Sequence, residues 1–230
     1  MSGKEKQLLD NYREMFKLFD CVHFNSSITE VVYKKQIPTL SGEVVAITHG
    51  DIRDCRRERA FADAKLELIF IGNDAPYKGL PLLIETLMEL YQDGYTNWEL
   101  NVWGTAGNSE VENIKYNGKF QSSELEKVFH TDGTLVVPSV CNETFSLITL
   151  EALSFGMPVL VSSTVGAKDI INEYDPWFVF TDKENLKEKL VEMMADKSRL
   201  RDFNNAIIHN EWHHSLEKHT KEIINLYERK

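Results

Sequence analysis

Residues 134–161, TLVVPSVCNETFSLITLEALSFGMPVLV, decide the fold of this chain. The short β-branched run at 135–137 ends at a proline and predicts a buried strand. A polar loop leads to residues 145–155, which are long enough for about three helical turns. Gly156 ends this helix, and a proline introduces the next strand at 159–161. The order strand, loop, helix and strand predicts a βαβ unit of a parallel sheet.

A single carboxylate lies inside the predicted helix. Glu151 is the only ionisable side chain between residues 144 and 161, and a lone carboxylate in an apolar helix is costly unless it is hydrogen-bonded. Glu143 lies just before the helix, with seven residues between the two acids. The helix dipole is positive at this end, where free backbone amides are expected from Thr144, Phe145, Ser146 and Leu147.

The predicted position of these groups indicates an anionic ligand with hydroxyl groups. The carboxyl end of a parallel strand beside a helix N-terminus is where α/β sheets bind anions. The amides would bind a phosphate while Glu143 and Glu151 accept hydrogen bonds from hydroxyls, and a nucleotide sugar carries both groups. A simpler explanation is that Glu143 complements the helix dipole and Glu151 pairs with a neighbouring helix. Spacing alone favours this simpler explanation.

The composition is that of an ordinary water-exposed globular chain. Of 230 residues, 42% are hydrophobic and 27% charged, and the net charge is −10. This charge argues against nucleic acid or an acidic membrane surface as the main partner. No apolar run is long enough to span a membrane, and the first residues do not show the basic-then-apolar pattern expected of a leader sequence. Three cysteines without CxxC spacing predict reduced thiols in a cytosol-like compartment.

The first 65 residues contain little that could form a core. Residues 1–50 hold a predicted helix at 4–18 and two short strands at 20–24 and 42–48, with a helix between them. Because these elements are too few to bury a core, we expect the tail of an incomplete amino-terminal domain. Residues 51–65 are dense in charge and are expected to form a linker or surface segment.

Strands and helices alternate regularly over residues 66–230, which we expect to form a second domain. This alternation predicts a doubly wound, Rossmann-like parallel α/β sheet with helices on both faces. Besides the βαβ unit, strands are predicted at 66–71, 98–103, 116–120 and 177–180, and helices at 80–90, 122–130, 165–171, 182–195, 197–209 and 215–229.

Three glycine-containing turns follow predicted strands. The first, GNDAPYKG, runs from Gly72 to Gly79 and carries Lys78, whose ammonium group suits a diphosphate. The others begin at Gly104 and Gly166, and each is a weak signal alone. The chain has neither a Walker sequence nor GxGxxG, so no nucleoside-triphosphatase or dinucleotide fingerprint applies.

A metal site is an alternative that we considered and do not predict. His209, His213 and Glu217 share helical spacing and could hold a metal ion, but such a helix face is more often only solvated.

Together these motifs resemble the carboxyl-terminal domain of family 4 glycosyltransferases, which are retaining enzymes of the GT-B fold. Glu143 and Glu151 match the two glutamates of the family signature, and residues 151–159 continue its pattern. The turns at Gly72, Gly104 and Gly166 match the family's glycine turns in order and at the expected separations. This agreement favours the nucleotide-sugar interpretation of the two glutamates and implies one half of a GT-B fold over about residues 66–229.

The resemblance also implies a role for each site residue. Glu143 and Lys78 would be catalytic: Glu143 contacts the hydroxyls of the donor sugar, and Lys78 neutralises the departing diphosphate, whose charge grows in the transition state. Glu151 would bind the ribose diol, and the nucleobase would lie near Lys119 and Phe120. Further donor contacts are implied for Gly72, Asn73, Gly79, Gly104, Thr144, Phe145, Ser146 and Leu147. The family needs no metal or cofactor besides its UDP- or GDP-linked donor sugar.

Two departures from the family pattern and the short amino-terminal part limit what the resemblance implies. Asn73 replaces the usual arginine, and Asp169 replaces the usual glutamate. Residues 1–50 resemble only the end of the acceptor-binding domain, with the domain crossing at 48–51. We therefore expect this chain to be a fragment, or a half that needs a partner. Alone it would bind the donor but turn over poorly, and a glycan or lipid-linked acceptor would be bound through the missing domain.

Three classes of function remain open at this point. The first is a glycosyltransferase that is cytoplasmic or attached at the inner face of the membrane and takes part in surface polysaccharide synthesis. The second is a non-catalytic nucleotide-sugar-binding module, which Asn73 would permit. The third is a sugar-nucleotide epimerase of GT-B architecture, which the apolar helix between the two glutamates disfavours.

Overall fold

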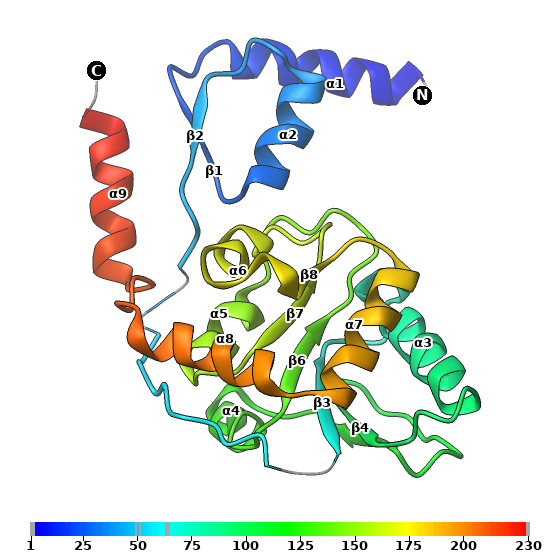
Figure 1. Cartoon of the computed structure of the whole chain (residues 1–230). Coiled ribbons are helices and arrows are strands. Elements are labelled where there is room, and N and C mark those ends of the chain that lie inside the picture. The colour runs from blue at the N-terminus through cyan, green and yellow to red at the C-terminus, as the bar shows by residue number, and fades with distance from the viewer. Residues whose placement is uncertain (1–2, 49, 51, 63–64, 229–230) are drawn as a thin grey trace.

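A sheet of six parallel strands forms the centre of the larger part of the computed structural model, which describes residues 3–48, 50, 52–62 and 65–228 (Figure 1). The strands are β3 (Leu66–Ile71), β4 (Trp98–Trp103), β5 (Ile114–Gly118), β6 (Thr134–Val137), β7 (Val159–Ser162) and β8 (Val179–Phe180). Their order is β5-β4-β3-β6-β7-β8. The chain first builds outward from β3 and then returns to place β6 beside it, so the winding direction reverses between β3 and β6.

Helices cover both faces of this sheet, as the alternating sequence predicts. They are α3 (Leu80–Gln92), α4 (Leu125–Val128), α5 (Leu147–Ser154), α6 (Lys168–Tyr174), α7 (Lys183–Ala195) and α8 (Ser198–His209). Right-handed crossovers that run in opposite directions along a sheet place α3 on one face and α5 and α6 on the other. Helix α7 packs against α3, where Lys183 Nζ lies 2.6 Å from both Glu85 Oε1 and Glu89 Oε1.

The sheet centre is apolar because helices cover it from both sides. Every residue of β6 and β7 is buried, which explains why these strands are continuous apolar runs rather than alternating ones. Trp98 and Phe70 are also buried, as expected, while Trp103 is only half-buried.

Several predicted boundaries shift in the structure. The helix predicted at 145–155 is α5, which begins only at Leu147. The strand predicted at 116–120 is β5, which ends at Gly118. Of the strand predicted at 177–180, the first two residues belong to the 3₁₀ turn η3 (Pro176–Phe178) and the last two form β8. The predicted helix at 122–130 begins with the 3₁₀ turn η2 (Ser122–Glu124), and only residues 125–128 form the α-helix α4. In each case a local turn competes with the apolar pattern that the prediction followed.

The amino-terminal part is a small lobe with a core of its own. It consists of α1 (Gly3–Phe16), β1 (Val22–Phe24), α2 (Ser27–Gln36) and β2 (Gly42–Val44), and the two strands pair in parallel. Phe24, Ile37 and Leu40 form a buried apolar cluster in it. Helix α1 buries none of its side chains, and large apolar groups such as Leu8 and Tyr12 remain exposed on it.

The last helix returns to this lobe. Helix α9 (Leu216–Glu228) runs beside the amino-terminal lobe in Figure 1 rather than along the six-stranded sheet. The His219 ring lies 5.8 Å from the His23 ring of β1. The chain therefore crosses between the two parts twice, near residue 50 and near residue 212. His49, Asp51 and Arg229, which the sequence places at the first crossing and at the end of the last helix, lie outside the described residues.

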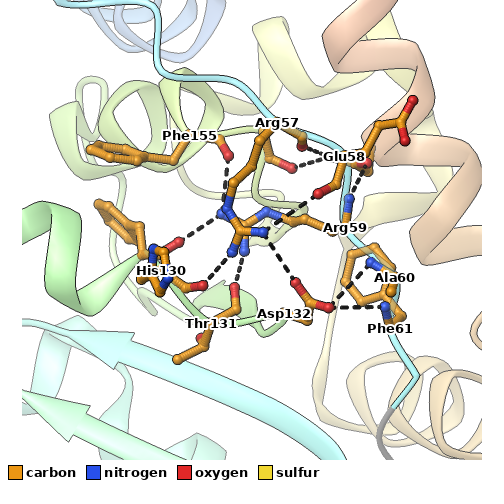
Figure 2. A network of polar contacts seen from close by, with 12 residues as sticks. Arg57, Glu58, Arg59, Ala60, Phe61, His130, Thr131, Asp132 and Phe155 are labelled. Atoms are coloured by element: carbon orange, nitrogen blue, oxygen red, sulfur yellow. Dashed lines mark hydrogen bonds and ion pairs between the residues drawn. The ribbon is translucent and has the colours of Figure 1, made fainter.

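Residues 52–62 form neither helix nor strand, and most of their side chains are exposed or half-buried, but two of them are buried in the protein. Arg59 and Phe61 are both 4% exposed. Figure 2 shows that Arg59 reaches the turn before β6: its guanidinium donates to the carbonyls of Phe129 at 2.7 Å and Thr131, and to that of Phe155 at 3.0 Å. Burial lowers the pKa of Arg59 to about 10, which keeps it charged at neutral pH. Carbonyls supplied by distant residues thus make burial of this charge possible.

No helix among the described residues combines the length and the apolar character needed to cross a bilayer.

Candidate functional site

The loops that follow β3 and β6 meet at the point where the strand order reverses. In open α/β sheets, ligands bind outside the carboxyl ends of the strands at such a reversal. The loop after β3 carries Lys78, and the loop after β6 carries Glu143. Lys78 Nζ lies 2.7 Å from Glu143 Oε1, and their side chains are 31% and 20% exposed, so the pair is partly open to solvent.

Glu143 is held in place from several directions. Its amide donates to Thr164 O at 3.0 Å, and its carbonyl accepts from the Gly166 amide at 2.9 Å, so the loop after β7 holds its backbone on both sides. Its second carboxylate oxygen accepts from Ser139 Oγ at 2.6 Å. Because both carboxylate oxygens and the backbone are engaged, the position of this acid is well defined before any ligand binds.

Glycines allow the loops to come this close. Gly79 has a φ of 78°, and a Cβ at this position would collide with the carbonyl oxygen of Pro138 at the end of β6. Gly104 has a φ of 91°, and a Cβ there would lie 2.6 Å from the carbonyl oxygen of Gly72. Backbone therefore packs directly on backbone between the loops after β3, β4 and β6. Gly79 and Gly104, which were predicted as donor contacts, are therefore also needed for the close packing of these loops.

The chain enters α5 through a strained residue. Ser146 has φ 111° and ψ 87°, a left-handed conformation that a serine adopts only at a cost of about 1–3 kcal/mol. Strain of this kind is often found where a loop must present its backbone to a ligand. Because α5 begins at Leu147, the amides of Thr144, Phe145 and Ser146 belong to the loop and not to the first helical turn as predicted.

Glu151 lies on α5 in its second turn and is half-buried. The sequence suggested a lone carboxylate inside an apolar helix, but the later start of α5 places Glu151 nearer to the loop. A half-buried carboxylate needs less compensation than an enclosed one. The argument that burial alone requires a ligand at Glu151 is therefore weaker than the sequence implied.

The remaining predicted donor residues lie around the edge of this arrangement. Asn73 is exposed, and its side-chain oxygen accepts from the Ala75 amide at 3.2 Å in a local turn. Lys119 and Phe120 follow β5 directly; Lys119 is exposed, and the Phe120 ring packs edge-on against Trp103 with 5.9 Å between the ring centroids. Asn73 lies on the same loop as Lys78, whereas Lys119 and Phe120 lie on the loop after β5, at the same carboxyl edge of the sheet.

The turn of Gly166–Asp169 contacts the amino-terminal lobe. The Asp169 carboxylate accepts from the Ser27 amide at 2.7 Å and from Ser27 Oγ at 2.6 Å. Ser26 Oγ, at the N-cap of α2, donates to Thr144 O at 2.6 Å. The resemblance implied only a mild change of a donor-site glutamate at Asp169, whereas the structure shows this side chain bound to the other lobe.

Sequence reasoning missed two residues that support Glu143. Ser139 is 1% exposed and donates to the Glu143 carboxylate, and its own carbonyl accepts from Thr164 Oγ1 at 2.6 Å. For Ser139, the only signal in the sequence was a hydroxyl residue directly after the predicted strand. Thr164 gave no such signal, because it lies on a different strand–helix loop.

The helical face that the sequence suggested for His209, His213 and Glu217 is not present. His209 ends α8 and Glu217 lies on α9, and the segment between them is not helical, so the helical spacing assumed from the sequence does not exist. Among the described residues no three histidine, cysteine or acidic side chains are grouped as metal ligands would be.

Comparison with known proteins connects this geometry to a family. An uncharacterized 41.2 kDa protein of the cps region of Klebsiella pneumoniae is 26% identical over 127 residues, which cover 53% of this chain and 34% of that protein. An uncharacterized glycosyltransferase of Methanocaldococcus jannaschii is 28% identical over 127 residues, covering 50% of this chain and 32% of that protein. This chain thus matches about a third of the length of these relatives.

A solved structure shows the same fold. Anabaena HepE, crystallised with UDP and glucose, superimposes with a TM-score of 0.74 at 14% identity, covering 97% of this chain and 67% of that one. The family model for group 1 glycosyl transferases matches residues 51–210. Since this match covers more than half of the residues and includes both glutamates and all three glycine turns, the chain belongs to the group 1 glycosyltransferases.

Proposed function

We propose that this chain supplies the donor-binding part of a retaining, family 4 glycosyltransferase, which transfers a sugar from a nucleotide diphosphate sugar to a glycan or lipid-linked acceptor. The observation that carries this proposal is the ion pair between Lys78 and Glu143 at the reversal of the strand order. A cation and a carboxylate placed together at this edge suit a ligand that has a diphosphate and hydroxyls in one molecule.

Lys78 is the group that would receive the diphosphate. It lies in a short turn after β3, its side chain is 31% exposed, and Glu143 is its ion-pair partner. A diphosphate carries more charge than one carboxylate, so it competes well for this ammonium. As the bond to the sugar breaks, negative charge grows on the leaving diphosphate, and Lys78 stabilises that charge.

Glu143 would then become available to the sugar. Its Oε1 accepts from Lys78, whereas its Oε2 accepts from Ser139. When a diphosphate takes the lysine, Oε1 is free to accept a hydrogen bond from a sugar hydroxyl, while Ser139 keeps the carboxylate oriented. The backbone contacts of Glu143 to Thr164 and Gly166 fix its distance from the sugar.

The loop before α5 and the outer strands would complete the donor site. The amides around Ser146 precede the first turn of α5, where backbone donors lack helical partners. We assign the sugar and diphosphate to the amides of Phe145, Ser146 and Leu147, and the ribose to Glu151. The base would lie beside Lys119 and Phe120, whose ring already packs on Trp103.

The acceptor would be bound by further polypeptide packed on the amino-terminal lobe. Support comes from the exposed apolar side chains of α1, such as Leu8 and Tyr12, and from relatives about three times as long as the matched region. In this proposal the chain binds donor by itself but transfers sugar slowly, because a closed cleft is needed to position the acceptor and exclude water.

Calorimetry with UDP, GDP and their sugar derivatives tests the proposed function. We expect one of the two nucleotides to bind the wild-type chain and Glu151→Ala to lose most of that affinity. Glu126→Ala, which changes an exposed glutamate on α4, is the matched control and should bind as the wild type does. If neither nucleotide binds the folded wild-type chain, the proposal is wrong.

A non-catalytic nucleotide-sugar-binding module is the second candidate. Asn73 favours it, because this exposed amide is used in a local turn and supplies no second cation for the diphosphate. Slow hydrolysis of a bound nucleotide sugar separates the candidates. An enzyme releases sugar at a rate that Glu143→Gln abolishes, whereas a binding module releases none.

A further inference from the structure

The two lobes are joined by polar contacts directly at the candidate donor loop. On the side of the amino-terminal lobe these contacts come from the first residues of α2. Asp169 binds the amide and the hydroxyl of Ser27 with its two carboxylate oxygens, at 2.7 and 2.6 Å. A carboxylate at a helix N-terminus is also favoured by the helix dipole, so this contact is stronger than a neutral hydrogen bond.

The second contact holds the donor loop itself. Ser26 is 1% exposed; its Oγ donates to the carbonyl of Thr144 at 2.6 Å and accepts from the Thr29 amide at 3.2 Å. Thr144 directly follows Glu143 and lies two residues before the strained Ser146. Fixing the Thr144 carbonyl therefore restricts the peptide planes that lead into α5.

Gly166 makes room for this contact. A Cβ at Gly166 would collide with the Thr144 carbonyl and would lie 2.5 Å from Ser26 Oγ. The Gly166 amide donates to the Glu143 carbonyl at 2.9 Å, and the Ala167 amide donates to the Phe145 carbonyl at 2.9 Å. The turn of Gly166–Asp169 thus holds the donor loop through its backbone and α2 through the Asp169 side chain.

We propose that this turn couples the conformation of the donor loop to its contact with the first turn of α2. In this view Ser26, Ser27 and Asp169 are positioning residues: they hold α2 against the donor loop and so keep the amides around Ser146 in the orientation that binds the donor. The proposal rests on the proposed function, because it assigns a purpose to the same donor loop. By linkage, a ligand that orders the loop must also stabilise the contact with α2.

Amide hydrogen exchange on the full chain tests this coupling first without any ligand. Asp169→Asn keeps the size of the side chain but removes its charge, and Ser27→Ala removes one of the two contacts. Both variants should accelerate exchange at residues 144–147, in the opposite lobe from Ser27. Asp202→Asn, which changes an exposed carboxylate on α8, is the matched control and should leave exchange unchanged.

The same measurement with UDP or GDP then tests linkage. In the wild type the nucleotide should slow exchange at the first turn of α2, and Asp169→Asn should remove this slowing and weaken nucleotide binding about fivefold or more. Gly166→Ala should weaken binding at least as much. Equal affinity in wild type and Asp169→Asn, with loop exchange unchanged, would overturn the coupling but leave the proposed function intact. Failure of the wild type to bind any nucleotide would overturn both.

Discussion

Lys78 Nζ and Glu143 Oε1 are 2.7 Å apart, although 65 residues separate them in the chain. The pair joins the loops after β3 and β6, the two strands between which the winding direction of the sheet reverses. Neither loop holds its charged residue with this geometry alone. The sheet brings the two loops together. Gly79 allows the loops to approach closely, and Ser139 orients the Glu143 carboxylate.

Removal of Lys78 should weaken diphosphate binding selectively. Charge-assisted hydrogen bonds contribute about 1.5–3 kcal/mol, so Lys78→Ala should reduce the affinity for UDP or GDP roughly 10- to 100-fold. The affinity for the corresponding monophosphate should change much less, because its single phosphate is also held by loop amides. Calorimetry with both nucleotides measures this difference. Lys115→Ala, at an exposed ion pair with Glu99, should alter neither affinity.

Glu143→Gln should affect the binding of the sugar rather than the binding of the diphosphate. The amide has no negative charge to hold Lys78, so UDP or GDP should bind as well as before or slightly better. The sugar-linked nucleotide should lose its additional affinity, because the sugar hydroxyl loses a charged acceptor. Competition calorimetry compares the two ligands on one variant. An equal loss for both would assign Glu143 to the diphosphate instead of the sugar.

Gly79→Ala should destabilise the fold more than a left-handed glycine normally requires. Gly94 is the matched control: its φ is 92°, and a Cβ there would meet nothing within 4 Å, so Gly94→Ala should cost about 1–2 kcal/mol of unfolding free energy. Gly79 has a φ of 78°, and its Cβ would also collide with Pro138 O, so the loss there should be clearly larger. Urea denaturation compares the two variants. Equal losses would show that the loops separate easily.

Arg59→Met should cost about 3 kcal/mol or more of unfolding free energy. It leaves the buried carbonyls of Phe129 and Phe155 without this donor, and an unsatisfied buried group costs about 1–3 kcal/mol. Arg57→Met is the control on the same segment, because that side chain is 38% exposed and its loss should stay within about 1 kcal/mol. Thermal and urea unfolding give both values.

The stability of the chain should fall on mild acidification because of His214. Burial, with His213 and other nearby cations, lowers the pKa of His214 to about 4. The unfolded state then takes up the proton at a higher pH than the folded state, so stability is lost as the pH falls from about 6.5 to about 4. The loss is no more than about 3 kcal/mol, because the half-buried ring keeps some contact with water.

Urea denaturation at several pH values measures this dependence. His214→Phe keeps an aromatic ring beside Trp212, whose ring centroid lies 5.0 Å from that of His214, and should flatten the curve between these pH values. His130→Asn, at an exposed histidine, should retain the wild-type pH dependence. If His214→Phe has the wild-type slope, other groups cause the acid sensitivity.

The sequence by itself determined the parallel sheet and where the candidate site lies along the chain. Strands β3 and β4 have the predicted bounds, because a buried strand is specified by a local run of apolar residues between turn residues. Lys78 and Glu143 were identified for a similar reason: each lies in a polar loop directly after such a strand, and parallel strands end at the same edge.

Only the tertiary structure decided which partners the polar residues have. Nothing near Arg59 in the sequence indicates that distant carbonyls will surround it, and nothing near Asp169 indicates that it will bind Ser27 of the other lobe. The start of α5 at Leu147, directly after the left-handed Ser146, was likewise not indicated by the sequence. Apolar burial is specified by a local pattern of residues. A hydrogen bond instead needs one particular partner, and that partner is brought near only when the chain folds.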